Sequence, residues 1–447
     1  MKRLLMCAAF AALAISAGAM AAPPKNVIIF VGAGMGPSTV AAARIYRYKE
    51  DGALFFESLD YAARVRTYAN DAQTTDGAAA ISAYMTGAKG NVGVLAMSAD
   101  TRALAPAVDR NGNAGLDNCG AGNGTPMQTL LETAKARGKA IGVVTTDELT
   151  GAAPAAALTH GCHRGATYAI AQQLAASGAD VLLGGGRQHF TPYHKTRNRL
   201  GRADGADLLA KLRKRGYTLA RDAGTLAAAR GGKLFGAFAA GPLDYELDRT
   251  IASPQPTLAQ MTLKAMEVLG ARGQGYVLLV EGARIDHAMH ATQAKRALTE
   301  VVALDDAVRV AVGKLRRADP ALEQTLVLVT ADHDTSLAFN GYPIRGNPLL
   351  DIVRHYKDGQ PMLDADGKTF TTLGFGTGLN RPGARAMLDS ATVLADGYSQ
   401  EAGIRKPQGG HGGGDVMLQA AGNGAHAFRG TLDNIRVHAL LKQTLGW

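Results

Sequence analysis

A carboxylate and an imidazole four residues apart are the clearest candidates for chemistry in this chain. Asp286 and His290 follow the apolar run Tyr276–Val280, which predicts a buried strand that ends near Glu281. If the chain turns helical there, side chains four residues apart project from one face. A carboxylate and an imidazole on one face suit a divalent metal, above all zinc. An ordinary surface ion pair would explain these two residues equally well.

Two further groups of possible metal ligands lie at a strand end and in a loop. Asp332 and His333 directly follow the strand-like run Thr325–Thr330, and His411 lies in the glycine-rich loop 408–415. Each group alone is a weak signal, because a lone histidine is more often a hydrogen-bonded polar residue than a ligand. Together the groups predict a two-metal hydrolase. The donors divide into three for a first zinc and two for a second: Asp286, His290 and His411, then Asp332 and His333.

Two other segments favour an anionic ligand. Residues 74–87 predict a helix that begins near Asp76, and a helix N-terminus attracts anions through its free amides and its dipole. Arg164 offers a guanidinium that can hold a phosphate with two parallel hydrogen bonds. A surface salt bridge is the alternative interpretation of Arg164.

The first 21 residues predict a secretory signal peptide. Lys2 and Arg3 supply its positive region, Leu4–Ile15 its apolar core, and Ala19–Ala21 a small-residue cleavage site. We therefore expect a mature chain, 22–447, that is exported and is periplasmic or secreted. No later apolar run is long enough to cross a membrane.

The cysteines indicate the compartment in which the protein folds. Of the three cysteines, Cys7 lies in the leader, and a disulfide between Cys119 and Cys162 is expected in an oxidising compartment. Two buried thiols are the alternative.

The formal net charge of +10 favours small anionic substrates or an acidic surface. Nucleic acid is not indicated, because the basic residues are scattered and only 6% of residues are aromatic.

Strand-like runs alternate with alanine-rich amphipathic segments along the whole chain. This alternation predicts an α/β fold with a large, mostly parallel central sheet flanked by helices on both faces. The expected strands are Asn26–Val31, Ala140–Thr145, Asp180–Gly184, Tyr276–Val280 and Thr325–Thr330, and the expected helices are Pro126–Ala136, Tyr168–Ser177 and Ala297–Leu315. Ligands of such folds bind beyond the carboxyl ends of the strands, where the residues above fall. Residues 188–249 are basic and glycine-rich, and we expect them to elaborate a single domain, 22–447.

Several motifs resemble the alkaline phosphatase family, over nearly all of residues 22–447. They are Asn26–Gly32, Thr75–Ala79, Met85–Lys89, Leu183–Arg187, Tyr245–Arg249, Val280–His287, Thr330–His333 and Ala425–Gly430. The resemblance implies a three-layer α/β/α sandwich and a homodimer. It also implies hydrolysis of small phosphate monoesters through a phosphoenzyme formed on a serine or threonine that two zincs and a magnesium flank.

Carried over by position, the resemblance assigns roles to the residues already singled out. Asp76 would precede the nucleophile, Arg164 would hold phosphate, and Glu281 would bind magnesium. The two zinc ligand sets are those given above.

The chain departs from this family's pattern at five positions that belong to one site. Ala33 stands where the family has an aspartate that bridges the second zinc and the magnesium, and Gly77 stands where the nucleophile belongs. Ala153 replaces a threonine or serine ligand of magnesium, Gly151 a polar residue near that metal, and Gly414 a common glutamate. We therefore expect the first zinc to be retained, the second weakened and the magnesium lost.

Three functional hypotheses follow from these departures. The first is a phosphomonoesterase scaffold that is inactive or severely impaired. The second is a zinc-retaining pseudoenzyme that binds phosphate or another anion. The third is a weak hydrolase in which zinc activates water directly, because Thr75 and Ser82 are poorly spaced to replace a nucleophile at position 77.

Overall fold

A ten-stranded sheet runs through the computed structural model, which describes residues 22–447. The predicted signal peptide lies outside the described residues. In spatial order the strands are β17 (Gly430–Asp433), β2 (Tyr61–Arg66), β16 (Val416–Gly422), β10 (Thr325–Ala331), β1 (Asn26–Gly32), β9 (Tyr276–Gly282), β5 (Ala140–Glu148), β6 (Val181–Gly185), β8 (Leu234–Ala237) and β7 (Thr218–Ala220). Only β16 runs antiparallel to its neighbours in this sheet, so the predicted α/β class with a mostly parallel sheet is confirmed.

The five strands predicted from the sequence are β1, β5, β6, β9 and β10, and they form the centre of the sheet. Their residues are almost entirely buried. Strands of a parallel sheet are covered on both faces, which explains why they appear in the sequence as continuous apolar runs instead of alternating ones.

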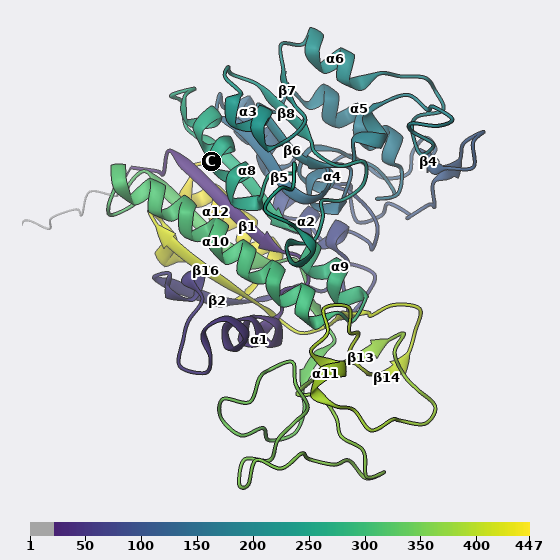
Figure 1. The fold of residues 1–447 in the computed structure, drawn as a ribbon. Helices are drawn as coiled ribbons and strands as arrows, with labels where there is room; N and C mark the ends of the chain where they lie inside the picture. Colours follow the sequence, from purple (N-terminus) through teal and green to yellow (C-terminus); the bar gives the residue numbers. More distant parts are fainter. Residues whose placement is uncertain (1–21) are drawn as a thin grey trace, which may run out of the picture.

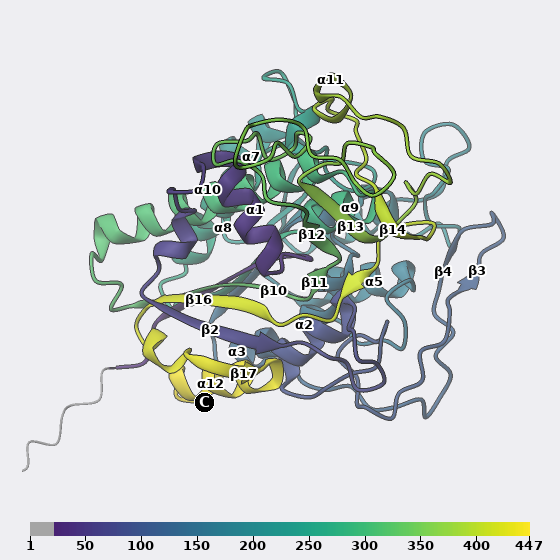
Figure 2. The same ribbon diagram turned by 90° about the horizontal axis from the view of Figure 1, so that it is seen from below.

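Helices cover both faces of the sheet (Figures 1 and 2). One face carries α1 (Pro37–Tyr48), α8 (Leu258–Gly270) and α10 (Ala294–Ala318), and the opposite face carries α2 (Gly77–Thr86), α3 (Leu130–Ala136) and α12 (Asn434–Thr444). Further helices are α4 (Ala152–Leu158), which packs on α2, α5 (Thr167–Ser177), which packs on α4, and α9 (Arg284–His290), which packs on α10.

The predicted helices are present, and one begins later than expected. Helix α3 starts at Leu130 instead of Pro126, because the Thr129 hydroxyl accepts a hydrogen bond from the amide of Glu132 and caps the helix there. Pro126 instead forms an isolated bridge with Met97.

The stretch 188–249 contributes β7 and β8, which extend the sheet at one edge, together with α6 (Leu208–Lys214) and α7 (Ala223–Ala228). A separate small sheet holds β12 (Leu337–Phe339), β13 (Leu373–Gly378) and β14 (Ala402–Arg405), near α11 (Ser390–Val393). Two short ribbons pair β3 (Ala107–Val108) with β4 (Ala114–Leu116) and β11 (Asp334–Thr335) with β15 (His411–Gly412). The 3₁₀ turns are Phe55–Ser58, Arg187–Phe190, Glu246–Asp248 and Ala425–Ala427. Among the described residues, no helix combines the length and the apolar character that a membrane crossing requires.

The register of the central strands brings their carboxyl ends to one edge. Gly32 at the end of β1 lies opposite Ala331 of β10 and Gly282 of β9, and Thr145 of β5 lies opposite Glu281 of β9. The residues that follow these strands therefore emerge side by side, at the edge where α/β folds bind ligands.

Candidate functional site

Helix α9 and strand β15 bring the first predicted zinc ligands together. Asp286 and His290 lie on one face of α9, with Asp286 Oδ2 3.0 Å from His290 Nε2. His411, which begins β15, places its Nε2 3.3 Å from His290 Nε2 and 3.8 Å from Asp286 Oδ2. Three residues from distant parts of the sequence thus converge, as the sequence predicted.

A fourth residue joins this cluster from the second predicted set. The ring of His333 stacks on that of His411, with centroids 3.6 Å apart. One ligand atom each from Asp286, His333 and His411 lie within 4.8 Å of one another. Four of the five residues assigned to two zincs therefore form one continuous cluster, which we call the imidazole cluster: Asp286, His290, His333 and His411.

The backbone fixes the orientation of all three imidazoles. The Nδ1 atoms of His290, His333 and His411 lie 2.6, 3.0 and 2.9 Å from the carbonyl oxygens of Gly409, Asp334 and Thr75. A carbonyl can only accept, so each Nδ1 carries the hydrogen and, in a neutral ring, each Nε2 keeps a free lone pair. Metal-bound histidines are commonly held by such an outer hydrogen bond.

Charge within the imidazole cluster favours an ionised carboxylate. Burial raises the pKa of Asp286, but the hydrogen bond from His290 and the charges of His333, His290 and His411 hold it well below its usual range. Burial, followed by the charge of His333, lowers the pKa of His411. An ionised Asp286 beside a neutral His411 is the protonation state that a metal requires of its ligands. His290 differs: burial lowers its pKa, but the hydrogen bond to Asp286 and the charge of that carboxylate raise it above the usual value, so His290 must lose a proton before it can bind a metal.

Asp332 connects the imidazole cluster to the first strand. Its Oδ1 accepts hydrogen bonds from the amides of Gly34 and His333, both at 2.9 Å. Its Oδ2 lies 3.4 Å from Nε2 of His333. Asp332 is almost completely buried, so these bonds position its carboxylate at the end of β10.

The anion-binding side of the site is built on the start of α2. Asp76 caps this helix: its Oδ1 accepts from the amides of Ala79 and Gly93, and its Oδ2 accepts from Nη1 of Arg164 at 3.1 Å. Burial raises the pKa of Asp76, but Arg164 and these hydrogen bonds bring it below its usual value. Arg164 is therefore held beside the helix N-terminus, with its side chain 40% exposed.

Gly77 is the first residue of α2, directly after the cap. A Cβ atom added to Gly77 would lie 2.9 Å from Asp332 Oδ2 and 3.4 Å from Cβ of Ala152. Gly77 also lines a cavity of about 20 Å³ together with Ala33, Arg164 and Asp332. No hydroxyl therefore enters this cavity from position 77.

Glu281 also lines this cavity. Its Oε2 accepts a hydrogen bond of 2.6 Å from the hydroxyl of Thr145 in β5. Burial, followed by the negative charge of Asp147, raises the pKa of Glu281 to about 8. The other positions assigned to this end, Ala33 and Ala153, are buried and carry no side-chain oxygen.

Sequence analysis missed two carboxylates at this site. Asp147 lines the same cavity, and Asp334 lies against the glycines of the loop that holds His411. A signal was present for both, because Asp147 follows the β5 core after Thr145 and Asp334 directly follows His333. The sequence alone does not distinguish these two aspartates from the polar residues that any loop contains.

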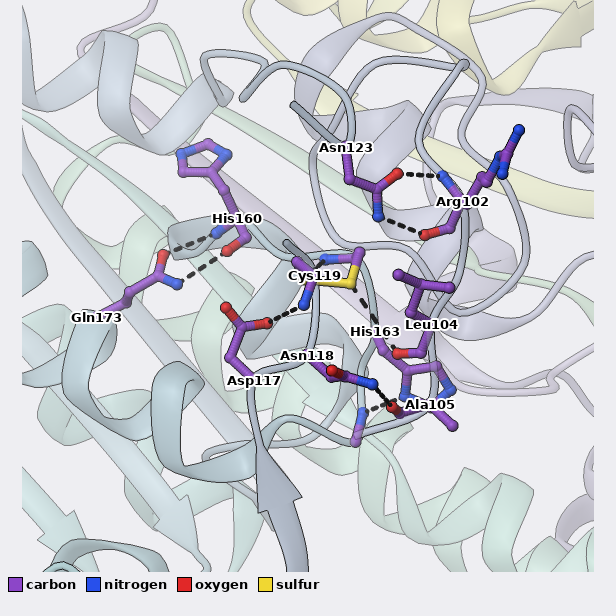
Figure 3. The surroundings of a disulfide bond; sticks show 12 residues. Arg102, Leu104, Ala105, Asp117, Asn118, Cys119, Asn123, His160, His163 and Gln173 are labelled. Atoms are coloured by element: carbon purple, nitrogen blue, oxygen red, sulfur yellow. Dashed lines mark hydrogen bonds between the residues drawn. A yellow bond between two sulfur atoms is a disulfide. The ribbon is translucent and has the colours of Figure 1, made fainter. Parts of the chain in front are cut away.

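The predicted disulfide is confirmed: Cys119 and Cys162 are bonded (Figure 3). Cys162 lies two residues before Arg164, whose amide donates to the carbonyl of Gly93. The disulfide and this hydrogen bond tie the arginine loop to the segment that follows α2.

The residues of the imidazole cluster fit a zinc ion. Nitrogen and carboxylate donors in this proportion suit zinc. Asp286 Oδ1 is buried and has no hydrogen-bond partner, which is the condition of an oxygen placed to meet a cation. The magnesium set that the resemblance implies does not fit, because Ala33 and Ala153 offer no ligand atom.

Comparisons with known proteins identify the family of this chain. The family model described as alkaline phosphatase matches residues 24–447. Tissue-nonspecific alkaline phosphatases from Gallus gallus and Homo sapiens are 35% and 33% identical to the chain, and each alignment covers 91% of it. The alignments cover 81% and 80% of those proteins.

Solved structures show the same fold. The alkaline phosphatase of Thermus thermophilus is 26% identical with a TM-score of 0.71, and covers 98% of this chain and 96% of its own. The enzyme of the Antarctic bacterium TAB5 is 20% identical with a TM-score of 0.69, and covers 95% and 99%. A TAB5 variant holds Mg in a site called M3.

The fold and the donors thus define an α/β protein with a candidate metal and anion site at the carboxyl ends of its parallel strands. The chain belongs to the alkaline phosphatase family. Alkaline phosphatases are metal-dependent and act on phosphate monoesters.

Proposed function

We propose that this member of the family holds zinc and binds phosphate, and that its hydrolysis of phosphate monoesters is absent or severely impaired. Asp286, His290 and His411 would hold the first zinc, and Asp332 with His333 a weaker second one. Zinc, when bound, would polarise a phosphoryl oxygen as a Lewis acid. Arg164 and the amides at the start of α2 would bind the remaining phosphoryl oxygens.

The observation that carries this proposal is the glycine at the start of α2. Attack on phosphorus by the protein needs a side-chain oxygen that enters the cavity beside Arg164, and Gly77 supplies none. Loss of a nucleophile that acts as part of a unit costs several powers of ten in rate.

The neighbouring hydroxyls are engaged elsewhere, which supports the proposal. Thr75 donates its hydroxyl to the carbonyl of Asp76 at 3.1 Å. Ser82 accepts from the amide of Ala96 at 2.8 Å and donates to the carbonyl of Val94. Both side chains are buried, so neither replaces the missing nucleophile without repacking.

Hydrolysis of p-nitrophenyl phosphate at alkaline pH, with zinc and magnesium added, tests the loss of activity. Turnover like that of an ordinary family member would contradict the proposal. Slow turnover without a burst of p-nitrophenol, and without phosphate trapped on the protein, would instead support direct attack by water. Phosphate trapped on Thr75 or Ser82 would show that one of these hydroxyls acts after all.

Calorimetry with inorganic phosphate tests the binding half of the proposal. We expect heat from the zinc-loaded protein, and at least a tenfold weaker affinity for Arg164→Ala, because a charged hydrogen-bond pair is lost. Arg187→Ala, which changes an arginine outside the site, is the matched control. No heat with or without zinc would eliminate phosphate binding.

Export and assembly belong to the same proposal. We infer from the signal sequence that the protein is periplasmic or secreted, and from the family that it forms a homodimer. Cell fractionation tests the first inference, and light scattering of the purified mature chain tests the second.

A further inference from the structure

A pocket of about 710 Å³ lies between the end of α9 and the loops around β13 and β14 (Figure 1). We call it the α9 pocket. Its polar lining includes Gln293 after α9, Asn380 after β13, Ser399 before β14 and Gln408 after β14. Its volume falls within the roughly 300–1,000 Å³ of small-molecule sites. The pocket is therefore large enough to hold a ligand group.

The α9 pocket adjoins the candidate metal and anion site. His287 lines both this pocket and the small cavity beside Arg164, and His290 of the imidazole cluster lines the pocket as well. The loop that carries Gln408 is held to α9: the Gly409 amide donates to the His290 carbonyl at 2.8 Å, and the Gly409 carbonyl lies 2.6 Å from Nδ1 of His290. A phosphate ester bound beside Arg164 thus has the α9 pocket next to it, across His287.

The lining of the α9 pocket favours a neutral ligand group. Among the described residues that line it there is no aspartate, glutamate, lysine or arginine, and two histidines, His287 and His290, are its titratable side chains. A charged group placed there would lose water without gaining an opposite charge, which costs free energy.

The polar side chains of the α9 pocket offer both donors and acceptors of hydrogen bonds. Gln293 Oε1 accepts from Nη1 of Arg296 at 2.7 Å, and its Nε2 remains as a donor. Asn380 Nδ2 donates to the Ser399 carbonyl at 2.6 Å, and its Oδ1 remains as an acceptor. Gln408 adds an exposed amide and Ser399 a half-buried hydroxyl. Ligand hydroxyls match this lining, because a hydroxyl both donates and accepts.

One wall of the α9 pocket is held in a strained conformation. Thr292 lines the pocket with φ 53°, in the left-handed region that β-branched residues rarely adopt. Its amide donates to the Met289 carbonyl at 2.9 Å, and its carbonyl accepts from the Gln400 amide at 2.8 Å. A Cβ atom added to Gly378 would lie 2.5 Å from Thr292 Cγ2, so this side chain is closely packed. Strain of this kind persists where the surroundings fix the chain, and it clusters at ligand sites.

We propose that the α9 pocket receives the alcohol part of a phosphate monoester, and that this part is a neutral, hydroxyl-rich group of monosaccharide size. A sugar phosphate meets both requirements, because its phosphate suits Arg164 and its hydroxyls suit the amides of the pocket. The inference rests on the proposed function, since the phosphate must bind beside Arg164 for the sugar to reach the pocket. It concerns binding, so it holds whether or not turnover follows.

Calorimetry on the zinc-loaded mature chain tests the proposal with three ligands. Glucose 6-phosphate carries a neutral ring with hydroxyls, cyclohexyl phosphate carries a six-membered ring without them, and inorganic phosphate carries no ring. Glucose 6-phosphate should bind at least tenfold more tightly than cyclohexyl phosphate, because polar groups of the pocket stay unpaired beside the apolar ring. If the protein hydrolyses these esters, their KM values provide the same comparison.

A substitution in the pocket separates sugar recognition from phosphate binding. Gln408→Leu should weaken the binding of glucose 6-phosphate at least fivefold and leave the affinity for inorganic phosphate and the zinc content unchanged. Gln360→Leu, which changes an exposed glutamine outside the pocket, is the matched control and should bind all three ligands like the parent protein.

The outcomes distinguish this inference from the proposed function. If inorganic phosphate gives no heat, the proposed phosphate site fails, and the sugar inference fails with it. If phosphate binds but cyclohexyl phosphate binds as tightly as glucose 6-phosphate, only the sugar inference is overturned. Unchanged binding of glucose 6-phosphate by Gln408→Leu overturns it as well. If Gln408→Leu loses zinc or its fold, Ser399→Ala decides by the same comparison.

Discussion

The two ends of the site differ in what holds their side chains. At the imidazole cluster, every histidine ring is fixed by a backbone carbonyl, and the Asp286 carboxylate is ionised. At the opposite end, Ala33 and Gly77 line the cavity without a polar atom, and Glu281 keeps its proton up to a pH of about 8. The Asp286 carboxyl of the first end therefore gives up its proton at a much lower pH than the Glu281 carboxyl of the second.

The two ends also differ in which atoms hold the key side chains in place. The hydrogen bonds that orient the imidazoles come from the backbone of Gly409, Asp334 and Thr75, so changes to neighbouring side chains do not remove them. The nucleophile depends on one side chain. A glycine at position 77 therefore leaves no side-chain oxygen there, while the hydrogen bonds of the imidazole cluster remain.

Restoring the second end should produce the largest effect. Ala33→Asp, Gly77→Ser and Ala153→Thr combined should raise the turnover of p-nitrophenyl phosphate by on the order of 10³-fold or more, because the nucleophile and its metal ligands act as a unit. Gly77→Ser alone should gain little, because Ala33 still supplies no bridging carboxylate and Ala153 no hydroxyl.

A folded, zinc-loaded triple variant that stays inert would contradict this prediction. Folding must be checked by melting temperature, because Ala153 is 1% exposed and a larger side chain there costs about 1–3 kcal/mol of stability.

Breaking the first end should have the next largest effect. His411→Ala removes a residue that contacts both His290 and His333, and should weaken zinc binding by more than the roughly 10–100-fold that loss of an outer hydrogen-bond partner costs. Competition with a chromogenic chelator measures the affinity. His426→Ala, an exposed histidine of a 3₁₀ turn, is the control.

Equal zinc affinity in His411→Ala and the parent protein would show that the imidazole cluster is not a metal site. The two ends would then differ only in how their side chains pack, and not in metal binding.

The smallest expected effect concerns Glu300, a buried carboxyl outside the site. Like Glu281 it has a raised pKa, but it does not line the cavity. Glu300 in α10 accepts from the amide of Glu246 at 2.7 Å, and burial raises its pKa from 4.5 to about 8. Between these values the folded protein binds more protons than the unfolded chain, so the free energy of unfolding falls as pH rises. Glu300→Gln removes this loss and keeps the hydrogen-bond acceptor.

Urea unfolding at pH 4.5 and pH 9 measures the difference. Glu300→Gln should match the parent protein at the lower pH and exceed its stability at the higher pH by a few kcal/mol at most, at about 1.4 kcal/mol per pKa unit. Magnesium should not change this gain, because no metal is expected at Glu300. A gain that disappears when magnesium is added would contradict this expectation.

Much of this protein could be predicted from particular residues. The continuous apolar runs gave the five central strands, because strands covered on both faces need no polar alternation. The spacing of Asp286 and His290 predicted that they share one face of a helix. The glycine at position 77 showed that no side-chain oxygen is available there. The start of α3 was misplaced by four residues, because a capping threonine and not proline set it.

By itself, the sequence determined the family, the mostly parallel sheet and the absence of a side-chain oxygen at position 77, because each depends on residue identity or on local periodicity. It favoured the disulfide, and the structure decided between a bond and two buried thiols. Only the tertiary structure decided where the carboxylates of Asp147 and Asp334 lie. Their positions depend on how the loops fold at the strand ends and on the space that nearby glycines leave open. The distance between a carboxylate and a residue in another loop cannot be read from their spacing along the chain.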